Sequence, residues 1–274
     1  MIPWTSFQVG KHRISCPSCG RGDRDNSVSL AINANGNGVM LCHRCRYVES
    51  YRPQLGSAHQ RPTIKPTIKA QNQQHERLND WGMNLWNSTQ VLSGVALQYL
   101  KARRCKIPCS DTHLRWHPSL KHPSGYVGPA LVALVTHVHS RKHLSLHRTW
   151  ITPTGKADLE TPRLPLANHS LKDGVIRLWP DEEVTYGLGI AEGIETALSL
   201  AWGYTPVWAT IDAGHMAKFP LLDGIESLVI AEDKDPAGIA AAASCSTRWA
   251  NEGRTVLVTD QRQNDLNDVL EEAA

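Results

Sequence analysis

Short apolar runs alternate with amphipathic segments through the C-terminal third of the chain. Such runs, bounded by polar residues, predict buried strands, and the amphipathic segments between them predict helices. The predicted strands cover residues 186–191, 206–211, 227–232 and 255–259, and the predicted helices cover 194–202 and 235–251. Because strands that alternate with helices form parallel sheets covered by helices, we expect a small α/β domain at residues 181–274.

The pattern is different in the middle of the chain. Helical spacing over residues 78–103, interrupted near Gly94, predicts two short helices, and strand-like runs follow. Those runs cover residues 130–139, 143–151 and 175–178. We expect a mixed α+β subdomain at residues 76–180. Residues 57–75 precede it and are rich in Pro, Lys, Gln and Thr, which predicts a flexible linker.

Four cysteines near the N-terminus form two CxxC pairs, and they are Cys16, Cys19, Cys42 and Cys45. This spacing is typical of a zinc ribbon, in which four thiolates hold one ion. The run at 28–41 contains an Asn-Gly turn and predicts a hairpin between the pairs. Since four thiolates leave no open coordination position, we expect a structural Zn²⁺ in a zinc ribbon at residues 1–56.

Charge divides the chain into two parts. Residues 1–180 hold 24 Lys and Arg against 9 Asp and Glu, whereas residues 181–274 hold 5 against 17. A basic region suits a polyanion such as nucleic acid, and an acidic region suits metal ions. In the zinc ribbon, Trp4 and Tyr47 are also available to stack on bases.

Nine basic residues are candidates for contacts with template or nucleotide phosphates. Any one of them is more simply explained as a solvated surface charge, but together they favour a basic groove. The candidates are Arg44, Arg46, Arg103, Arg104, Arg148, Lys156, Arg163, Lys172 and Arg177. Those on or beside the middle strands are expected on exposed faces.

Three carboxylates follow two of the predicted strands. Glu192 comes after the run at 186–191, and Asp233 and Asp235 come after the run at 227–232. The carboxyl ends of parallel strands meet at one rim of a sheet, so these acids are expected to converge. Oxygen ligands of this kind suit Mg²⁺ or Mn²⁺ and predict phosphoryl or nucleotidyl transfer.

Several segments resemble a known family. AEGIETALSLAW around Glu192 and LVIAEDKDPAGIAAA around Asp233 resemble the two signature segments of Toprim domains. The segments YLKARR, HRTW, TGKA and DLNDVL extend the resemblance to zinc-ribbon/Toprim primases, which phages, plasmids and other mobile elements encode, often fused to a helicase. The resemblance therefore covers most of the chain.

The resemblance implies roles for particular residues. It makes Glu192, Asp233 and Asp235 the catalytic, metal-binding acids, and Asp265 and Asp268 an additional acidic site. Replicative-type primases usually carry an aspartate four residues after the glutamate, where this chain has Thr196, preceded by Glu195. The composition of the metal shell is therefore open at this point.

The function that the resemblance implies is DNA-templated synthesis of short RNA primers. The partners would be single-stranded DNA, ribonucleoside triphosphates and a replicative helicase in trans, because the sequence has no GxxxxGK[ST] loop. A Toprim nuclease would use the same acids to hydrolyse a phosphodiester, and a catalytically silent zinc-dependent DNA-binding adaptor would not need them. Both remain as alternatives.

The sequence shows no pattern of a membrane span or a signal peptide. No stretch approaches the roughly 20 apolar residues of a membrane span, and residues 1–10 do not have the pattern of a signal peptide. We therefore expect a cytoplasmic protein with no membrane contact.

Overall fold

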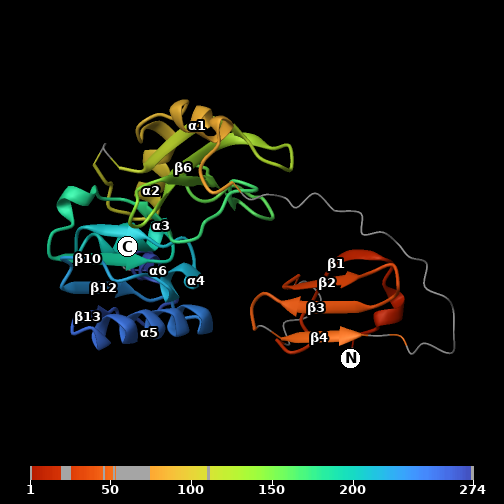
Figure 1. The fold of residues 1–274 in the computed structure, drawn as a ribbon. Helices are drawn as coiled ribbons and strands as arrows, with labels where there is room; N and C mark the ends of the chain where they lie inside the picture. Colours follow the sequence, from red (N-terminus) through yellow and green to blue (C-terminus); the bar gives the residue numbers. More distant parts are fainter. Residues whose placement is uncertain are drawn as a thin grey trace. The chain divides into compact units, whose positions relative to one another are not determined.

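The computed structural model describes residues 2–19, 26–45, 47–51, 53, 75–109 and 112–272. It divides into two compact units, Met1–Lys69 and Ala70–Ala274 (Figure 1). Most of the predicted linker, and the candidate residue Arg46, lie outside the described residues. Among the helices described, none has the length and apolar character needed to cross a bilayer.

The first unit is a four-stranded antiparallel sheet in the order β1-β2-β3-β4. Its elements are η1 (Trp4–Ser6), β1 (Gly10–Ile14), β2 (Val28–Ile32), β3 (Gly38–Cys42) and β4 (Val48–Tyr51). The predicted hairpin is β2 and β3, and the side chain of Asn33 accepts hydrogen bonds from the N–H groups of Asn35 and Asn37 in its turn. Trp4 is buried and stacks on Tyr51, so it belongs to the core and is not available to stack on bases.

A nine-stranded mixed sheet forms the second unit. Its strands are β5 (Leu114–Lys121), β6 (Val127–His137), β7 (His143–Trp150), β8 (Arg163–Pro165), β9 (Gly174–Arg177), β10 (Gly187–Ala191), β11 (Val207–Ala209), β12 (Ser227–Ala231) and β13 (Thr255–Val258). The order is β13-β12-β10-β11-β9-β6-β7-β8, with β5 paired to β6. Strands β10 to β13 are parallel, which confirms the predicted α/β part.

The helices of the second unit are α1 (Asp80–Asn87), α2 (Gly94–Ala102), α3 (Ile194–Leu200), α4 (Ala213–Ala217), α5 (Pro236–Asn251) and α6 (Leu266–Glu272), with η2 (Asp181–Glu183) between strands. Helices α3 and α5 cover opposite faces of the parallel strands, whereas α1 packs on the antiparallel strands. Leu188 and Ile190 of β10 pack in the same cluster as Trp249 of α5, whereas Ala191 packs in the cluster of α3. Because both faces are covered, the strands are continuously apolar.

The two predicted subdomains share this one sheet. Strand β9 pairs with β6 on one side and with β11 on the other, so one sheet runs through the predicted segments 76–180 and 181–274. Strand β5 was not predicted. It contains Pro118 and an irregular register between His117 and Leu120. Among the described strands it pairs with β6 alone, and an isolated bridge joins its Trp116 to Gln90. Such an edge position tolerates proline.

Candidate functional site

The four cysteines of the first unit converge as the sequence predicts. Their sulfur atoms all lie within 4.8 Å of one another, with 3.6 Å between Cys16 and Cys45 and 3.9 Å between Cys19 and Cys42. Tetrahedral zinc with bonds of about 2.3 Å to sulfur needs sulfur atoms about 3.8 Å apart. Within the described ranges, no other set of three or more His, Cys, Asp or Glu side chains is this compact.

Local hydrogen bonds favour a thiolate at Cys42. Burial alone would raise the pKa of this thiol, but the N–H of Cys45 and the hydroxyl of Ser27 approach the sulfur and help to lower its pKa to about 6. A thiolate is the form that ligates zinc. The residues therefore fit a structural Zn²⁺, and all four ligands come from the two predicted pairs.

In the second unit, acids gather at the carboxyl ends of the parallel strands. Glu192 directly follows β10, and Asp233 follows β12 by one residue. Asp235 caps α5 by accepting hydrogen bonds from the N–H groups of Ala237 and Gly238, at 2.9 and 2.8 Å. The helix thus begins directly at the rim, as parallel α/β topology requires.

Without a cation, the ionised forms of two of these acids are electrostatically unfavourable. Burial, followed by the charges of neighbouring acids, raises the pKa of Glu192 to about 7. Burial and the charge of Asp265 do the same for Asp233, whose pKa is also about 7. Oε1 of Glu192 and Oδ1 of Asp233 are buried and have no hydrogen-bond partner among the described residues.

The acidic rim fits a divalent cation. An ion such as Mg²⁺ would supply both the missing partner for these oxygens and the charge that offsets the repulsion between the carboxylates. Asp265 lies near enough to raise the pKa of Asp233, and Asp268 also contributes. Asp265 caps α6 through the N–H groups of Asn267 and Asp268, at 2.7 and 3.0 Å.

A buried ionic network lies beside the rim. Glu195, in the first turn of α3, is almost fully buried and accepts a hydrogen bond of 2.6 Å from the hydroxyl of Tyr99. Nζ of Lys156 lies 3.6 Å from the same carboxylate oxygen. Burial alone would raise the pKa of Glu195, but Arg163, Lys156 and Tyr99 outweigh it and lower the pKa to about 2. Glu195 is therefore ionised.

Residues 187–274, which carry the acidic rim, match the Toprim domain family. This part of the chain is a Toprim domain. Residues 76–178 match a domain of unknown function, DUF7146. None of the curated proteins matches the chain in sequence.

Solved structures extend the comparison to the whole chain. The primase fragment of the bacteriophage T7 primase-helicase protein superposes with a TM-score of 0.50 at 17% identity, covering 97% of this chain and 96% of that one. The zinc-binding and RNA polymerase domains of the Aquifex aeolicus primase give a TM-score of 0.45 at 13% identity, with coverages of 97% and 77%. With its Toprim domain and Cys₄ cluster, the chain has the zinc-ribbon/Toprim primase fold.

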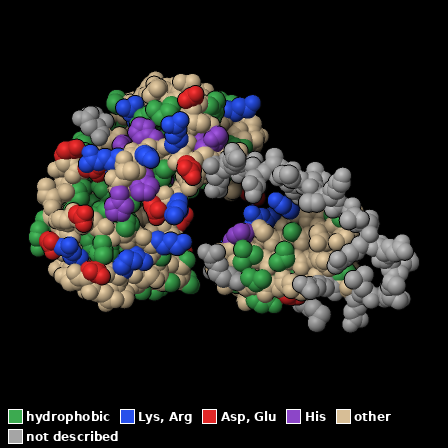
Figure 2. All heavy atoms as spheres, viewed as in Figure 1, with side chains coloured by type: hydrophobic (Ala, Val, Ile, Leu, Met, Phe, Trp, Pro, Cys, Tyr) green, Lys and Arg blue, Asp and Glu red, His purple; other side chains and the backbone are tan. Residues whose placement is uncertain are grey.

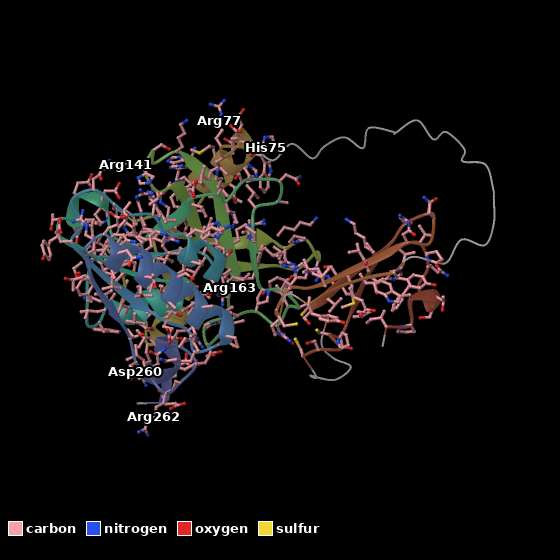
Figure 3. All side chains as sticks on the ribbon, turned by 60° about the horizontal axis from the view of Figure 1, so that its bottom comes forward. His75, Arg77, Arg141, Arg163, Asp260 and Arg262 are labelled. Carbon is pink, nitrogen blue, oxygen red and sulfur yellow. The ribbon has the colours of Figure 1, made fainter. Side chains whose placement is uncertain are left out.

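Two of the basic candidates lie beside the Toprim acids. Lys156 pairs with Glu195. Arg163 of β8 is exposed, and a side chain placed at Gly193 would come within 3.6 Å of its Nη1 atom. Its charge also acts on Asp233, opposing the rise in that pKa. In Figure 3, Arg163 lies between Arg77 and Arg262, which mark opposite ends of the second unit in that view.

Two other candidates are buried, which corrects the expectation of exposed faces. Arg148 is 6% exposed, donates to the carbonyl of Pro165 and packs on the ring of Trp150. Arg177 is 4% exposed and pairs with Asp181. The sequence pattern fails here because other segments of the chain cover these positions. Pro165 accepts a hydrogen bond from Arg148, and Thr136, Val138 and Asp181 accept hydrogen bonds from Arg177.

The remaining described candidates are dispersed. Arg103 forms an ion pair with Glu271, Arg104 is exposed after the end of α2, and Arg44 is exposed in the first unit. Lys172 lines a cavity of about 360 Å³ that also reaches Asp212 of the Toprim domain. Figure 2 shows Lys, Arg and His side chains spread over the visible face of the second unit rather than in one row.

Sequence reasoning missed Asp212. It follows β11 and caps α4, and its charge contributes to the raised pKa of Glu192. Nδ1 of His215 lies 2.9 Å from Asp212, and its Nε2 lies 2.7 Å from the carbonyl of Leu171. The rule that found Glu192, an acid after an apolar run, also identifies Asp212 after the run at 206–211.

The raised pKa values predict how stability depends on pH. Glu192 and Asp233 bind protons more tightly in the folded protein than in the unfolded one. Their contribution to the free energy of unfolding is therefore fully present below about pH 4 and is lost as pH rises through about 7. Without added Mg²⁺ or Mn²⁺, Asp233→Asn should stabilise the second unit at pH 8 by about 1 to 2 kcal/mol. Water reaches part of the site and screens the charge, which keeps the gain below the value for a fully buried carboxylate.

Urea unfolding at pH 5 and pH 8 measures this effect. Tryptophan fluorescence reports mainly on the second unit, because only Trp4 lies in the first. The variant should lose less stability than the wild type between the two pH values. Equal losses in both proteins would show that folding does not raise the pKa of Asp233.

Proposed function

We propose that this chain is a DNA primase that makes short RNA primers on single-stranded DNA by metal-dependent nucleotidyl transfer. The observation that carries the proposal is the pair of buried, unpartnered carboxylate oxygens on Glu192 and Asp233, with Lys156 and Arg163 beside them. Acids that need a divalent cation, next to cations that suit a triphosphate, are the two requirements of nucleotidyl transfer.

The Toprim acids would hold Mg²⁺ or Mn²⁺. Glu192, Asp233 and Asp235 are the proposed ligands, with Asp265 and Asp268 supplying further negative charge. A bound divalent ion would activate the attacking 3′-hydroxyl and neutralise the leaving pyrophosphate. Glu192 is also proposed to accept the proton of that hydroxyl as a general base.

Lys156 and Arg163 are proposed to bind the triphosphate. Arg163 is exposed beside Gly193, at the start of α3, and Lys156 is partly exposed. Glu195, itself hydrogen-bonded to Tyr99, holds Lys156 from the protein interior. A lysine fixed in this way loses less conformational freedom when phosphate binds.

The second prediction concerns Glu195. Glu195→Gln removes the charge that holds Lys156, so the KM for ribonucleoside triphosphates should rise by about tenfold while kcat changes less. Tyr99→Phe should have a smaller effect in the same direction, because it removes one hydrogen bond and no charge. Steady-state kinetics at saturating template would check both variants, and an unchanged KM in both would contradict this role.

Product analysis tests the function itself. Single-stranded DNA, all four ribonucleoside triphosphates and Mg²⁺ or Mn²⁺ should yield short labelled oligoribonucleotides, and the template should stay intact. Degradation of the template without ribonucleotide incorporation, on several sequences, would instead identify a Toprim nuclease. Neither reaction, in protein that still binds DNA, would favour the adaptor alternative. A helicase added in trans should stimulate synthesis.

A further inference from the structure

An exposed tryptophan lies among three cations at the C-terminal end of α3. Trp202 is 62% exposed, and it lines a cavity of about 690 Å³ together with Lys101, Arg104 and Lys106. Nζ of Lys106 lies 6.0 Å from the centroid of the indole ring. We call these four residues the Trp202 patch. Aromatic rings beside cations bind single-stranded nucleic acid, because bases stack on the ring while phosphates pair with the charges.

The protein holds the indole ring in place. Nε1 of Trp202 donates a hydrogen bond of 2.8 Å to the carbonyl of Arg104, and Nζ of Lys106 donates one of 3.1 Å to the carbonyl of Ala201. The polar edge of the indole is thus already bonded, and the exposed part of the side chain is the apolar ring. A fixed ring binds a base at a lower cost in conformational entropy than a mobile one.

The backbone at Arg104 is a second observation. Its φ of 54° is in the left-handed region, at the position after a helix where glycine is favoured. Helix termination by itself therefore favours glycine at this position. An arginine there places its charge at the edge of the cavity, at a cost in backbone strain.

The Trp202 patch connects to the Toprim acids through two helices. Helix α3 begins at Gly193, next to Glu192, and ends just before Trp202, so it spans about 10 Å at 1.5 Å per residue. Helix α6 begins after Asp265, whose charge acts on Asp233, and its residue Leu270 lines the cavity. The rim and the Trp202 patch therefore lie at opposite ends of one buried helix.

We propose that the Trp202 patch binds the template DNA strand outside the catalytic rim, with a base stacked on Trp202 and phosphates paired with Arg104 and Lys106. This proposal rests on the proposed primase function only for the identity of the strand. The patch itself is defined by the exposed ring, the three cations and the cavity.

The first test compares two exposed tryptophans in the full-length chain. Trp202→Ala should weaken binding of a fluorescein-labelled oligodeoxythymidine by about tenfold in anisotropy titrations, and Trp202→Phe should recover most of the loss because phenylalanine still stacks. The matched control is Trp81→Ala, since Trp81 is 58% exposed on α1 and lies outside the cavity. The control should bind like the wild type.

The second test separates stability from binding. Arg104→Gly should raise the melting temperature, because it relieves the left-handed backbone, but it should weaken DNA binding and lower the slope of log K against log salt by about 0.7. Arg141→Gly is the matched control, because Arg141 is also exposed and has a φ of 58° but lies outside the cavity. Arg141→Gly should remove one charge without changing the slope of log K against log salt for DNA binding.

The outcomes separate this proposal from the proposed function. Binding is measured without ribonucleotides, so it tests the patch even if the wild type makes no primer. Wild-type DNA affinity in both Trp202→Ala and Arg104→Gly would overturn the patch, whether or not primers are made. The same variants are also tested with an oligoribonucleotide of matching sequence. If they weaken binding of the RNA but not of the DNA, the patch binds product RNA and the template proposal is overturned.

Discussion

Primer synthesis should be lost when either Glu192→Gln or Asp233→Asn is introduced, with rates reduced on the order of 10³-fold or more. Both variants keep the shape of the side chain and remove one negative charge from a rim that holds buried, unpartnered oxygens. Because these charges serve a cation and not packing, the variants should fold normally and bind single-stranded DNA like the wild type.

A neighbouring acid provides the control for this result. Glu232 ends the apolar run that Asp233 follows, but its carboxylate is paired with Lys234 at 2.9 Å. Glu232→Gln should therefore retain most of the activity. Gel sizing of labelled products measures all three variants. Near-wild-type synthesis by both Glu192→Gln and Asp233→Asn would mean that the catalytic centre lies elsewhere.

Loss of zinc is the second large effect that we expect. Cys42→Ser should release the ion and unfold the first unit, because the metal contributes much of the folding free energy of so small a core. Template-dependent initiation should fall at least about tenfold. The second unit has its own sheet and hydrophobic clusters, so its unfolding transition should be unchanged.

Cys109→Ser is the matched control, since Cys109 is an exposed cysteine of the second unit. Zinc content by mass spectrometry, near-ultraviolet circular dichroism and initiation assays should distinguish the two variants. If Cys42→Ser were purified with a full equivalent of zinc, the Cys₄ assignment would be wrong. Full initiation by a zinc-free variant would remove the first unit from the mechanism.

The sequence alone determined the elements whose signals are local. The paired cysteines specify the four-cysteine cluster because each CxxC turn brings two thiols together over a few residues, and the hairpin of β2 and β3 joins the pairs. The parallel strands were identified because burial on both faces makes them continuously apolar. Glu192, Asp233 and Asp235 follow from those strands by chain order.

Which polar groups contact one another, and which are buried, depends on the tertiary structure. Tyr99 and Glu195 are 96 residues apart, and their hydrogen bond depends on α2 packing near the start of α3. Sequence periodicity does not report which positions neighbouring elements cover, so Arg148 and Arg177 were assigned to exposed faces although they lie inside.

The same limit applies to Trp202. Its side chain belongs to an apolar segment that continues α3, and nothing in the sequence distinguishes it from a core residue. It is exposed because α3 ends at Leu200, and the carbonyl of Arg104, 98 residues away, then fixes the indole. The sequence therefore predicted the four cysteines and the three rim acids, whose positions follow from short turns and strand ends. The cations around those acids depend on long-range packing, which the folded structure specifies.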